Sequence, residues 1–322
     1  MKSKSTYFLG VGSALISSIF FGMLGIFSSI GQNAGLSTTS RIFFRFLVAA
    51  IVLYVIIKIK HKDLRLPKGS LFKLVIGSIL YFSLTSYLLF RAYDYIGTGF
   101  ATVLSFTYPI MVLLMSIAID KERVGGLQLL GTAMAFFGLV VVVGPLSASN
   151  ALGVFLGLLS AITFTLYVRM LAKDYAKDLD GLVLMFYVFS ISSIFWFFPS
   201  CIEVIKNPVS IDIYRASLSV VGLAIPGTIV ACTLFNYGVR NIGGRMTSIL
   251  SIFDPLTSVL IGCVVLNEKL SDGFGYGVLF IIMGTVMVSL FEKKSESANI
   301  VVINENAPPL KFNPRGFRRR RA

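Results

Sequence analysis

Asp254 is the residue in this chain with the clearest capacity for chemistry, because it lies within an apolar run and directly precedes Pro255. If that run is a membrane helix, a carboxylate near its centre costs about 2.5–3.5 kcal/mol on insertion scales, so it should face the protein interior or a water-filled cavity. One interpretation is structural: Pro255 breaks the helix, and Asp254 caps the half-helix that follows. The other is functional: Asp254 binds a substrate amine or carries the proton that couples transport. The two roles are compatible.

Two arginines form a second candidate feature. Arg41 and Arg45 are four positions apart, so they share one face of a helix. The ordinary role of such arginines near a membrane surface is to anchor at the lipid headgroups. The alternative is a guanidinium pair that lines the outer vestibule and attracts carboxylates, with Arg45 the deeper of the two. Arg91 and Asp94 close the next apolar run, where we expect them to interact locally.

A cavity for a zwitterion or an aromatic metabolite needs hydroxyls, amides and ring faces inside otherwise apolar helices. Tyr108 follows Asp254 in interest, because it directly precedes a second proline within an apolar run, Pro109. We predict a substrate-binding set that consists of Asp254, Tyr108, Arg45, Phe21, Ser17, Tyr81, Tyr87, Tyr167, Thr228, Asn236, Ser105 and Ser251. Each serine or threonine in this set also has a structural interpretation, as a residue bonded back to its helix or packed closely between helices.

Catalysis and metal binding are not predicted. His61 is the only histidine, and it lies in a loop. The three cysteines fall in or beside separate apolar runs without metal-ligand spacing, so we interpret Cys201, Cys232 and Cys263 as buried, inert thiols. The chain has no GxxxxGK[ST] loop for nucleotide. We therefore expect no catalytic residue, no metal and no cofactor. Trp196, the only tryptophan, is expected to anchor at the membrane interface.

The elements that must position these residues are long apolar helices. Of the 322 residues, 56% are hydrophobic and only 14% are charged, with a mean hydropathy of +0.84, whereas soluble proteins average about 25% charged. A helix needs about 20 residues to cross a hydrocarbon core of about 30 Å. We predict an all-α polytopic membrane protein with ten transmembrane helices, at about 8–30, 39–58, 71–93, 97–119, 125–144, 151–171, 181–201, 215–238, 244–266 and 273–291.

The chain repeats itself after 146 positions, which indicates an internal duplication. Each copy holds five spans, an odd number, so the second copy must enter the membrane from the opposite side. This predicts two inverted five-helix repeats, over residues 1–147 and 148–291, with a site near mid-depth between them. The repeated glycines are interpreted as helix-packing positions and the two glutamates as structural. The matching landmarks are Ile96-Gly97, Leu104-Ser105, Pro109, Glu122, Gly131 and Gly138, followed by Ile242-Gly243, Leu250-Ser251, Pro255, Glu268, Gly277 and Gly284.

The net charge of +14 does not indicate nucleic acid as a partner, because of where the charges fall. Most lysines and arginines lie in loops on the side of the amino terminus or in the tail, 292–322. The positive-inside rule therefore predicts a multi-pass protein of the cell membrane with both termini in the cytoplasm. The tail is expected to be disordered and solvated, or alternatively attached to anionic lipid through Arg318 to Arg321. The expected partners are a small-molecule substrate and the lipid bilayer, with the chain as a monomer or a homodimer.

Several of these patterns together resemble the EamA family of the drug/metabolite transporter superfamily. They are the five-plus-five arrangement, the glycine-rich first span of each half, and Pro109…Glu122 echoed by Pro255…Glu268. Arg45-Phe46 and Asp254-Pro255 match short patterns of that family. The resemblance covers about residues 8–291. It implies alternating-access transport of small metabolites, often amino acids, through a central cavity, and it implies no catalytic chemistry.

These observations predict a secondary transporter for amino acids or related metabolites, acting as an exporter by analogy with the family. Its cavity is expected between spans one, three, four, six, eight and nine, and Asp254 is the predicted coupling residue. The alternative is a proton-independent exchanger or facilitator for a nucleotide-, sugar- or cofactor-like metabolite. A membrane-embedded enzyme would need clustered histidines and acids, and a non-transporting membrane partner would need a large loop or a soluble domain. The sequence has neither feature.

Overall fold

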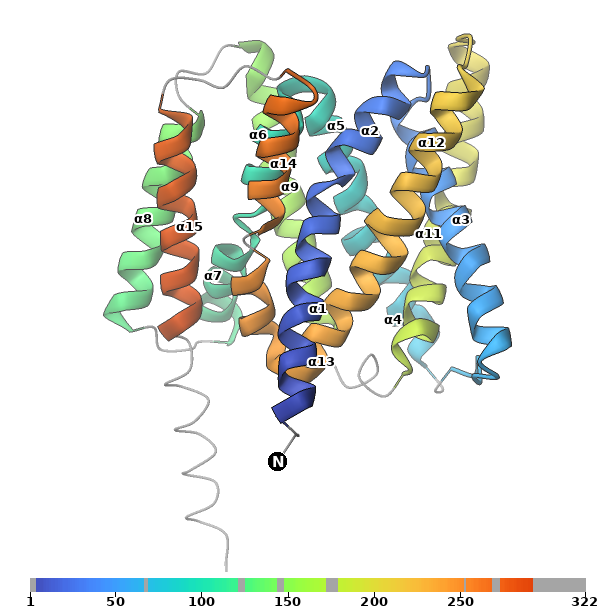
Figure 1. Ribbon diagram of the computed structural model, residues 1–322. Helices are drawn as coiled ribbons and strands as arrows, with labels where there is room; N and C mark the ends of the chain where they lie inside the picture. The colour runs from blue at the N-terminus through green and yellow to red at the C-terminus, as the bar shows by residue number, and fades with distance from the viewer. Residues whose placement is uncertain are drawn as a thin grey trace, which may run out of the picture.

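The computed structural model describes residues 4–66, 69–120, 125–143, 148–171, 179–251, 253–267 and 273–291. Within these ranges the chain is helical and contains no strand (Figure 1). Six of the described helical segments are long and apolar enough to cross a membrane, and shorter apolar helices accompany them. The protein is thus a polytopic all-α membrane protein. The landmarks Glu122 and Glu268 and the tail, 292–322, lie outside the described residues.

The first repeat supplies spans one to five, and spans one, three and four are each built from more than one helical segment. In chain order its elements are α1 (Lys4–Gly22), α2 (Leu24–Asn33), α3 (Thr38–Ile59), α4 (Ser70–Ile76), the π-helix η1 (Gly77–Ser83), α5 (Leu84–Ile96), α6 (Thr98–Ser105), α7 (Tyr108–Asp120) and α8 (Gly126–Val143).

The second repeat follows a similar plan, with span eight interrupted by a π-helix and span nine broken near its middle. The join predicted between spans eight and nine, at 239–243, is helical instead, because α13 continues to Leu250. Its elements are α9 (Ala148–Leu171), α11 (Gly181–Lys206), α12 (Ile213–Ala224), the π-helix η2 (Ile225–Val230), α13 (Ala231–Leu250), α14 (Phe253–Val264) and α15 (Phe274–Phe291). We call the end of the bundle where α1 begins the amino-terminal face, and the other end the opposite face; they are the bottom and top of Figure 1.

Local sequence explains where several helices begin. Ser37, Asp180 and Asp212 each start a helix by accepting a hydrogen bond from a backbone N–H within the next three residues, the ordinary role of short polar side chains at this position. Gly97 separates α5 from α6 with a φ of 80°, a left-handed value that glycine adopts without steric cost.

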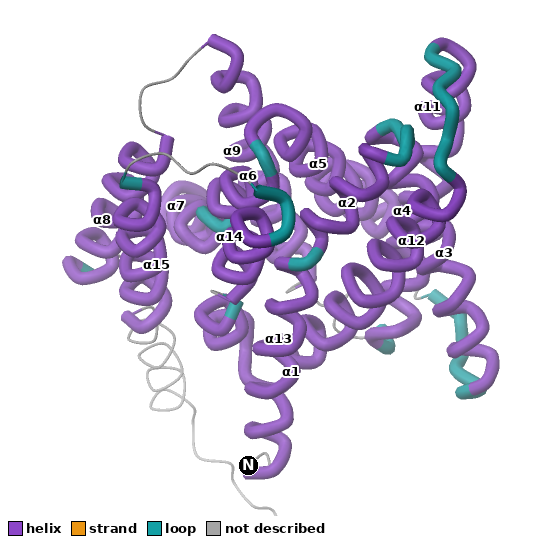
Figure 2. Tube along the Cα trace, turned by 45° about the horizontal axis from the view of Figure 1, so that its top comes forward, coloured by secondary structure: helices purple, strands orange, loops and turns teal. Residues whose placement is uncertain are grey.

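The inverted duplication is visible where α8 packs against α15 (Figures 1 and 2). A Cβ atom on Gly138 would lie 2.6 Å from the carbonyl oxygen of Gly277, and one on Gly284 would collide with the carbonyl oxygen of Gly131. Gly131 and Gly277 are repeat mates, as are Gly138 and Gly284, so each of these contacts is the image of the other. Small residues of this kind allow membrane helices to approach closely.

A second matched pair of contacts joins the two repeats to each other. A Cβ atom on Gly10 of α1 would lie 2.7 Å from Ile242 Cγ2, and one on Gly153 of α9 would lie 2.6 Å from Ile96 Cγ2. Ile96 and Ile242 are repeat mates. The first span of each repeat therefore packs against the third span of the other repeat, and the two repeats interleave around a shared centre.

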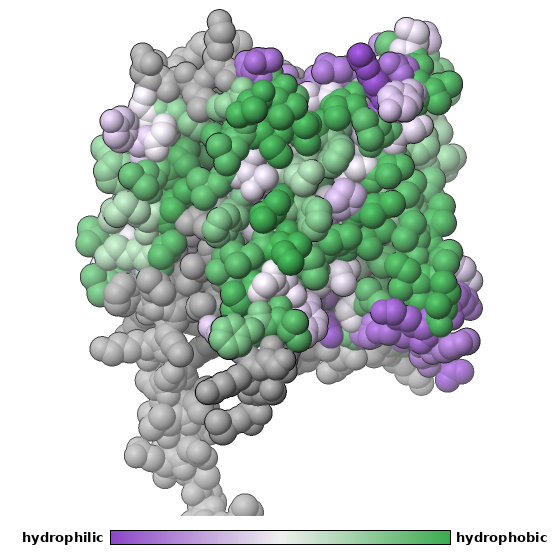
Figure 3. Space-filling model, in the orientation of Figure 1, coloured by the Kyte–Doolittle hydropathy of each residue, from purple (hydrophilic) through white to green (hydrophobic). Residues whose placement is uncertain are grey.

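The surface suits a bilayer. Figure 3 shows an apolar band on the visible face, with polar residues gathered towards the two ends. Large apolar side chains such as Ile194, Phe198 and Tyr276 are exposed, as lipid-facing residues of a membrane helix are.

Two expectations about single residues were wrong. Trp196 does not anchor at an interface: it is 7% exposed, and its ring stacks on Tyr87 at 4.9 Å. Cys201 is exposed on α11 and Cys263 is half-buried, so of the three cysteines only Cys232 is a buried thiol.

Candidate substrate site

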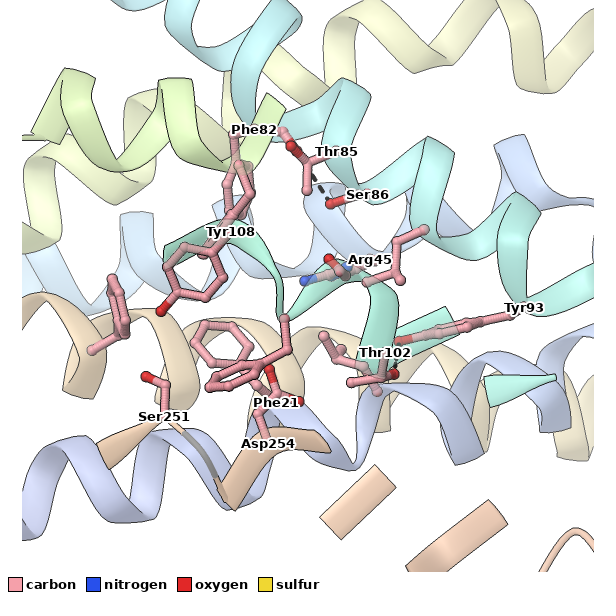
Figure 4. Close-up of a pocket in the computed structure, with 16 residues that line it drawn as sticks. Phe21, Arg45, Phe82, Thr85, Ser86, Tyr93, Thr102, Tyr108, Ser251 and Asp254 are labelled. Carbon is pink, nitrogen blue, oxygen red and sulfur yellow. Dashed lines mark hydrogen bonds between the residues drawn. The ribbon is translucent and has the colours of Figure 1, made fainter. Parts of the chain in front are cut away.

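A cavity lies between the two repeats, where spans four and nine are broken (Figure 4). The cavity volume available to the centres of water molecules is about 80 Å³. This is room for several waters or for part of a small molecule. Its walls are mostly apolar and aromatic, with a small number of polar groups, the usual composition of a small-molecule site. The two charged groups in the lining are Arg45 and Asp254.

The lining follows the internal symmetry of the chain. Three pairs of repeat mates line the cavity, and so does one phenylalanine from the first span of each repeat. The cavity therefore lies on the pseudo-two-fold axis, where inverted-repeat transporters hold their substrates. The three pairs are Leu89 and Phe235, Ser105 and Ser251, and Tyr108 and Asp254, and the two phenylalanines are Phe21 and Phe164.

The prolines of the broken spans do not interrupt helices but begin them. α7 starts at Tyr108 and α14 at Phe253, so Pro109 and Pro255 each lie in a first turn. Proline is tolerated there because its missing N–H would have had no partner in the helix. The break comes just before each proline, and it places Asp254 at the positive end of the α14 dipole.

Asp254 is held by its backbone, while its side chain has no hydrogen-bond or ion-pair partner among the described residues. A Cβ atom on Gly22 of α1 would lie 2.6 Å from the carbonyl oxygen of Asp254, so glycine allows the two spans to meet here. The buried Oδ1 atom forms no hydrogen bond, and no described residue forms an ion pair with the side chain. Asp254 lies inside the first turn of α14, and the described residues show no capping hydrogen bond to its carboxylate, so they do not support the capping interpretation.

Arg45 reaches the cavity from α3 and is 3% exposed. Its Nε donates a hydrogen bond to Thr228 Oγ1 at 2.5 Å, and the Thr228 hydroxyl donates to the carbonyl oxygen of Leu223 at 2.7 Å. The guanidinium carbon lies 5.2 Å and 5.4 Å from the ring centroids of Phe46 and Phe90, within cation–π range. Among the described residues, no carboxylate pairs with Arg45.

The two π-helical segments place matching residues beside this arginine and the cavity. The two π-helices occupy matching places in the two repeats: adding 146 to the residue numbers of η1 gives the range of η2 to within a few residues. Phe82 in η1 lines the cavity, and its repeat mate Thr228 in η2 holds Arg45. Single π-turns within helices occur frequently at functional sites.

Arg41, one turn from Arg45 towards the opposite face, has a different role. Its Nη2 donates to both oxygens of Asp94 at 2.8 and 3.1 Å and to Thr38 Oγ1 at 2.9 Å, and its Nη1 donates to Ser28 Oγ at 2.6 Å. Because Arg41 is 1% exposed, it neither anchors at headgroups nor lines a vestibule. The expected contact between Arg91 and Asp94 is present at 3.6 Å, but the closer partner of Asp94 is Arg41.

Aromatic rings form the rest of the site. The Tyr108 and Phe164 rings meet edge-on at 4.8 Å, and the Phe21 and Phe235 rings at 6.0 Å. All four line the cavity and come from both repeats. The site thus offers ring surfaces for an apolar or planar group and two ionisable side chains, Arg45 and Asp254, that form no ion pair among the described residues.

Eight of the twelve predicted binding residues line the cavity or stand directly behind its wall. Asp254, Tyr108, Arg45, Phe21, Ser105 and Ser251 are brought together around the cavity. Thr228 stands directly behind Arg45, and Tyr167 packs behind the ring of Phe82 at 4.8 Å with its hydroxyl on Met185 Sδ at 3.7 Å.

The remaining four predicted residues do not line the cavity. Ser17 donates to the carbonyl oxygen of Ala231 at 2.7 Å and so joins α1 to α13. Tyr81 packs against the core, as does Tyr87 in its stack on Trp196. Asn236 accepts from Arg240 Nε at 3.2 Å, closer to the amino-terminal face.

The stripe of span three that faces the cavity was not predicted. Phe82, Ser86, Leu89 and Tyr93 all line it, as does Thr85. Their spacing of four, three and four residues is the period of one helix face, a signal that was available in the sequence. Tyr81 and Tyr87 were predicted from their residue type alone, and they do not follow that period.

Comparison with known proteins agrees with this architecture. The model of the EamA-like transporter family matches residues 8–144 and again residues 151–290. An uncharacterized transporter of Archaeoglobus fulgidus is 24% identical over 263 residues, which cover 81% of this chain and 89% of the relative. An S-adenosylmethionine uptake transporter of Rickettsia conorii is 22% identical over 298 residues, which cover 90% and 95%. A solved structure shares the fold with a TM-score of 0.63 at 16% identity, over 92% of this chain and 99% of its own.

Proposed function

This chain belongs to the EamA-like transporter family, and on that premise we propose that it is a secondary transporter for a small zwitterionic metabolite, an amino acid or a close relative of one. The observation that carries the proposal is the pair of unpaired charges in the cavity. Arg45 comes from the first repeat and Asp254 from the second, and both line the same cavity. A ligand that carries a carboxylate and an amine would neutralise both.

The energetics of burial support this class of ligand. A buried charge without a partner is costly, and a hydrogen bond to a charged group is stronger than one between neutral groups. A zwitterion therefore gains more from this cavity than a neutral molecule of the same size. The rings of Phe21, Tyr108, Phe164 and Phe235 supply surface for the rest of the molecule.

The names of relatives point to the same chemistry. S-adenosylmethionine, the cargo in the name of the Rickettsia conorii relative, carries an α-amino group and a carboxylate beside an aromatic base. We take the shared α-amino acid group, and not the whole of that molecule, as the proposed recognition element here.

The proposed cycle is alternating access. The two interleaved repeats hold the ligand between Arg45 and Asp254 and expose the cavity first to one face and then to the other. Lys58, Lys60, Lys62 and Arg65 gather at the amino-terminal face, so we assign that face to the cytoplasm. We propose export as the direction, and Asp254 as the residue that exchanges a proton for the ligand amine, because its buried Oδ1 has no hydrogen-bond partner among the described residues.

A ligand screen tests the proposed recognition. Ligand at 100 times its Kd stabilises the folded protein by about 2.7 kcal/mol, so the unfolding midpoint of the purified protein should rise with α-amino acids or S-adenosylmethionine. The rise should disappear in both Arg45→Gln and Asp254→Asn and persist in Ser17→Ala, which lies outside the cavity. Equal rises in all four proteins, or a response only to compounds without an amine and a carboxylate, would refute the zwitterion site.

A further inference from the structure

A cluster of hydroxyl groups closes the cavity towards the opposite face and joins the two repeats. Ser258 Oγ on α14 donates to Thr102 Oγ1 on α6 at 3.0 Å and lies 3.3 Å from the carbonyl oxygen of Thr98. Thr102 Oγ1 donates to that carbonyl at 2.8 Å, and the Tyr93 hydroxyl lies 3.1 Å from Thr102 Oγ1. Since the single Thr102 proton is used on Thr98, Tyr93 and Ser258 are the donors to Thr102. We call these four residues the polar lock.

The polar lock lies between the candidate site and the opposite face. Tyr93 and Thr102 line the cavity, and Ser258 is four residues after Asp254, on the same face of α14. The four residues are buried, with exposed fractions from 1% for Ser258 to 6% for Tyr93. α2 covers the lock, because a Cβ atom on Gly25 would lie 2.6 Å from Thr98 Cβ.

The other end of the cavity has no matching hydroxyl cluster in its sequence. The repeat mates of Tyr93, Thr98 and Ser258 are Val239, Gly244 and Val112, and only Thr102 has a hydroxyl counterpart, Ser248. The packing differs as well: α6 packs closely against α14, whereas no comparable packing joins α7 to α13 among the described residues. The duplication alone does not account for the lock, because three of its four residues have repeat mates without a hydroxyl group.

We propose that the polar lock is the gate of the opposite face and that Tyr93 connects it to the site. This proposal rests on the proposed function, because a gate has meaning only in a cavity that alternates between two faces. A ligand that takes the Tyr93 hydroxyl as a donor, or that moves α14 through Asp254, weakens the bonds to Thr102. The bonds of Ser258 cross between the repeats, so losing them frees α14 from α6. Water can replace such hydroxyl bonds at small net cost, which suits a contact that must open in each cycle.

Cysteine accessibility tests the gate without any substrate. Cys201, Cys232 and Cys263 are replaced by alanine, and Ser105→Cys places a reporter thiol on the cavity wall. A membrane-impermeant maleimide is added to intact cells and to inverted vesicles. Asp212→Cys, at an exposed position beyond α11, identifies the preparation that presents the opposite face. In that preparation the double substitution Thr102→Val with Ser258→Ala should raise the labelling rate about tenfold, because the hydroxyl bonds between α14 and α6 are lost together with the Tyr93 acceptor.

Two further variants make the result specific. Tyr93→Phe keeps the ring and removes one donor, so it should raise the rate about threefold. Ser17→Ala removes a buried hydroxyl bond between α1 and α13, outside both the cavity and the lock, so it should leave the rate unchanged. Unchanged labelling in the double variant, or an equal increase in Ser17→Ala, overturns the proposal. Size-exclusion elution and Asp212→Cys labelling confirm that each variant is folded and inserted. Because no ligand is used, failure of the gate is distinct from failure of the zwitterion site.

Discussion

Asp94 and Asp254 are both carboxylates within apolar spans, but their surroundings give them opposite energetics. Asp94 accepts hydrogen bonds from Arg41 and Thr38, whereas Asp254 has no partner among the described residues. Removing one member of a buried ion pair leaves an uncompensated charge. Neutralising an unpartnered acid removes such a charge instead. The same change to asparagine should therefore act in opposite directions at the two positions.

At Asp94, replacement by asparagine should lower the free energy of unfolding by about 3–5 kcal/mol, because the charge of buried Arg41 would then be uncompensated. The measurement is the thermal unfolding midpoint in detergent. Asp212→Asn is the matched control: its ion pair with Arg215 is exposed, so its effect should stay below about 1 kcal/mol. Shifts of equal size in the two variants would contradict a structural role for Asp94.

At Asp254, replacement by asparagine should leave the unfolding midpoint unchanged or raise it. The substitution keeps the shape of the side chain and removes only its charge. Proton-driven flux in vesicles should fall at least tenfold, because the asparagine amide cannot bind and release a proton as a carboxyl group does. Ser17→Ala, which changes a residue outside the cavity, should retain flux. Full gradient-driven transport by Asp254→Asn would exclude Asp254 as the coupling residue.

At the scale of elements, the contact between α8 and α15 depends on the absence of side chains. Gly138→Ala would place a Cβ atom 2.6 Å from the Gly277 carbonyl oxygen and 2.7 Å from Ile281 N. Backbone atoms cannot move aside as a flexible side chain does, so the helices must separate, at a cost of about 1–3 kcal/mol. Gly275→Ala in α15 is the control, because no atom lies within 4 Å of its added Cβ. The midpoint should fall for Gly138→Ala only, and equal changes would argue against close packing.

The amino-terminal end of α11 carries a pH-dependent contact. Burial alone would raise the pKa of Asp180, but hydrogen bonds from Lys62 and from the backbone N–H groups of Leu182 and Val183 hold that pKa below its ordinary value. A lowered folded-state pKa means that the stabilisation is present at neutral pH and is lost as the pH falls below about 4. Because Asp180 is 41% exposed, solvent screening keeps this contribution below about 1 kcal/mol.

Asp180→Asn should therefore reduce the loss of stability between pH 7 and pH 3. The variant lacks the contact at both pH values, so it has less to lose than the natural chain. Asp63→Asn is the control, since Asp63 is 70% exposed and lies 3.8 Å from Arg65. Thermal unfolding at the two pH values measures the difference. A larger pH-dependent loss in Asp180→Asn than in the natural chain would reverse the assigned sign.

At the scale of the whole molecule, the features that depend on chain order were predictable. The register of 146 residues and the odd number of spans predicted inverted repeats. The symmetric contacts of Gly138 with Gly277 and of Gly284 with Gly131 confirm that relation. The repeat also identified Tyr108, Asp254, Ser105 and Ser251, all of which line the cavity.

The rotation of each helix about its axis was harder to predict. In span three, Phe82 and Ser86 line the cavity, whereas Tyr81 and Tyr87 pack elsewhere. The inward-facing residues follow the period of one helix face, so residue type alone did not identify them. The ion pair of Arg41 with Asp94 joins residues 53 positions apart, and no local pattern encodes such a contact.

The central claim is that a zwitterionic ligand crosses the membrane through the cavity between Arg45 and Asp254. The most direct test is flux in proteoliposomes that contain the purified chain, with a panel of radiolabelled α-amino acids and S-adenosylmethionine. We expect at least one member to be transported saturably, with the flux abolished by Arg45→Gln and by Asp254→Asn and retained in Ser17→Ala. Flux no greater than in protein-free liposomes for the whole panel, or flux that survives both substitutions, would contradict the account.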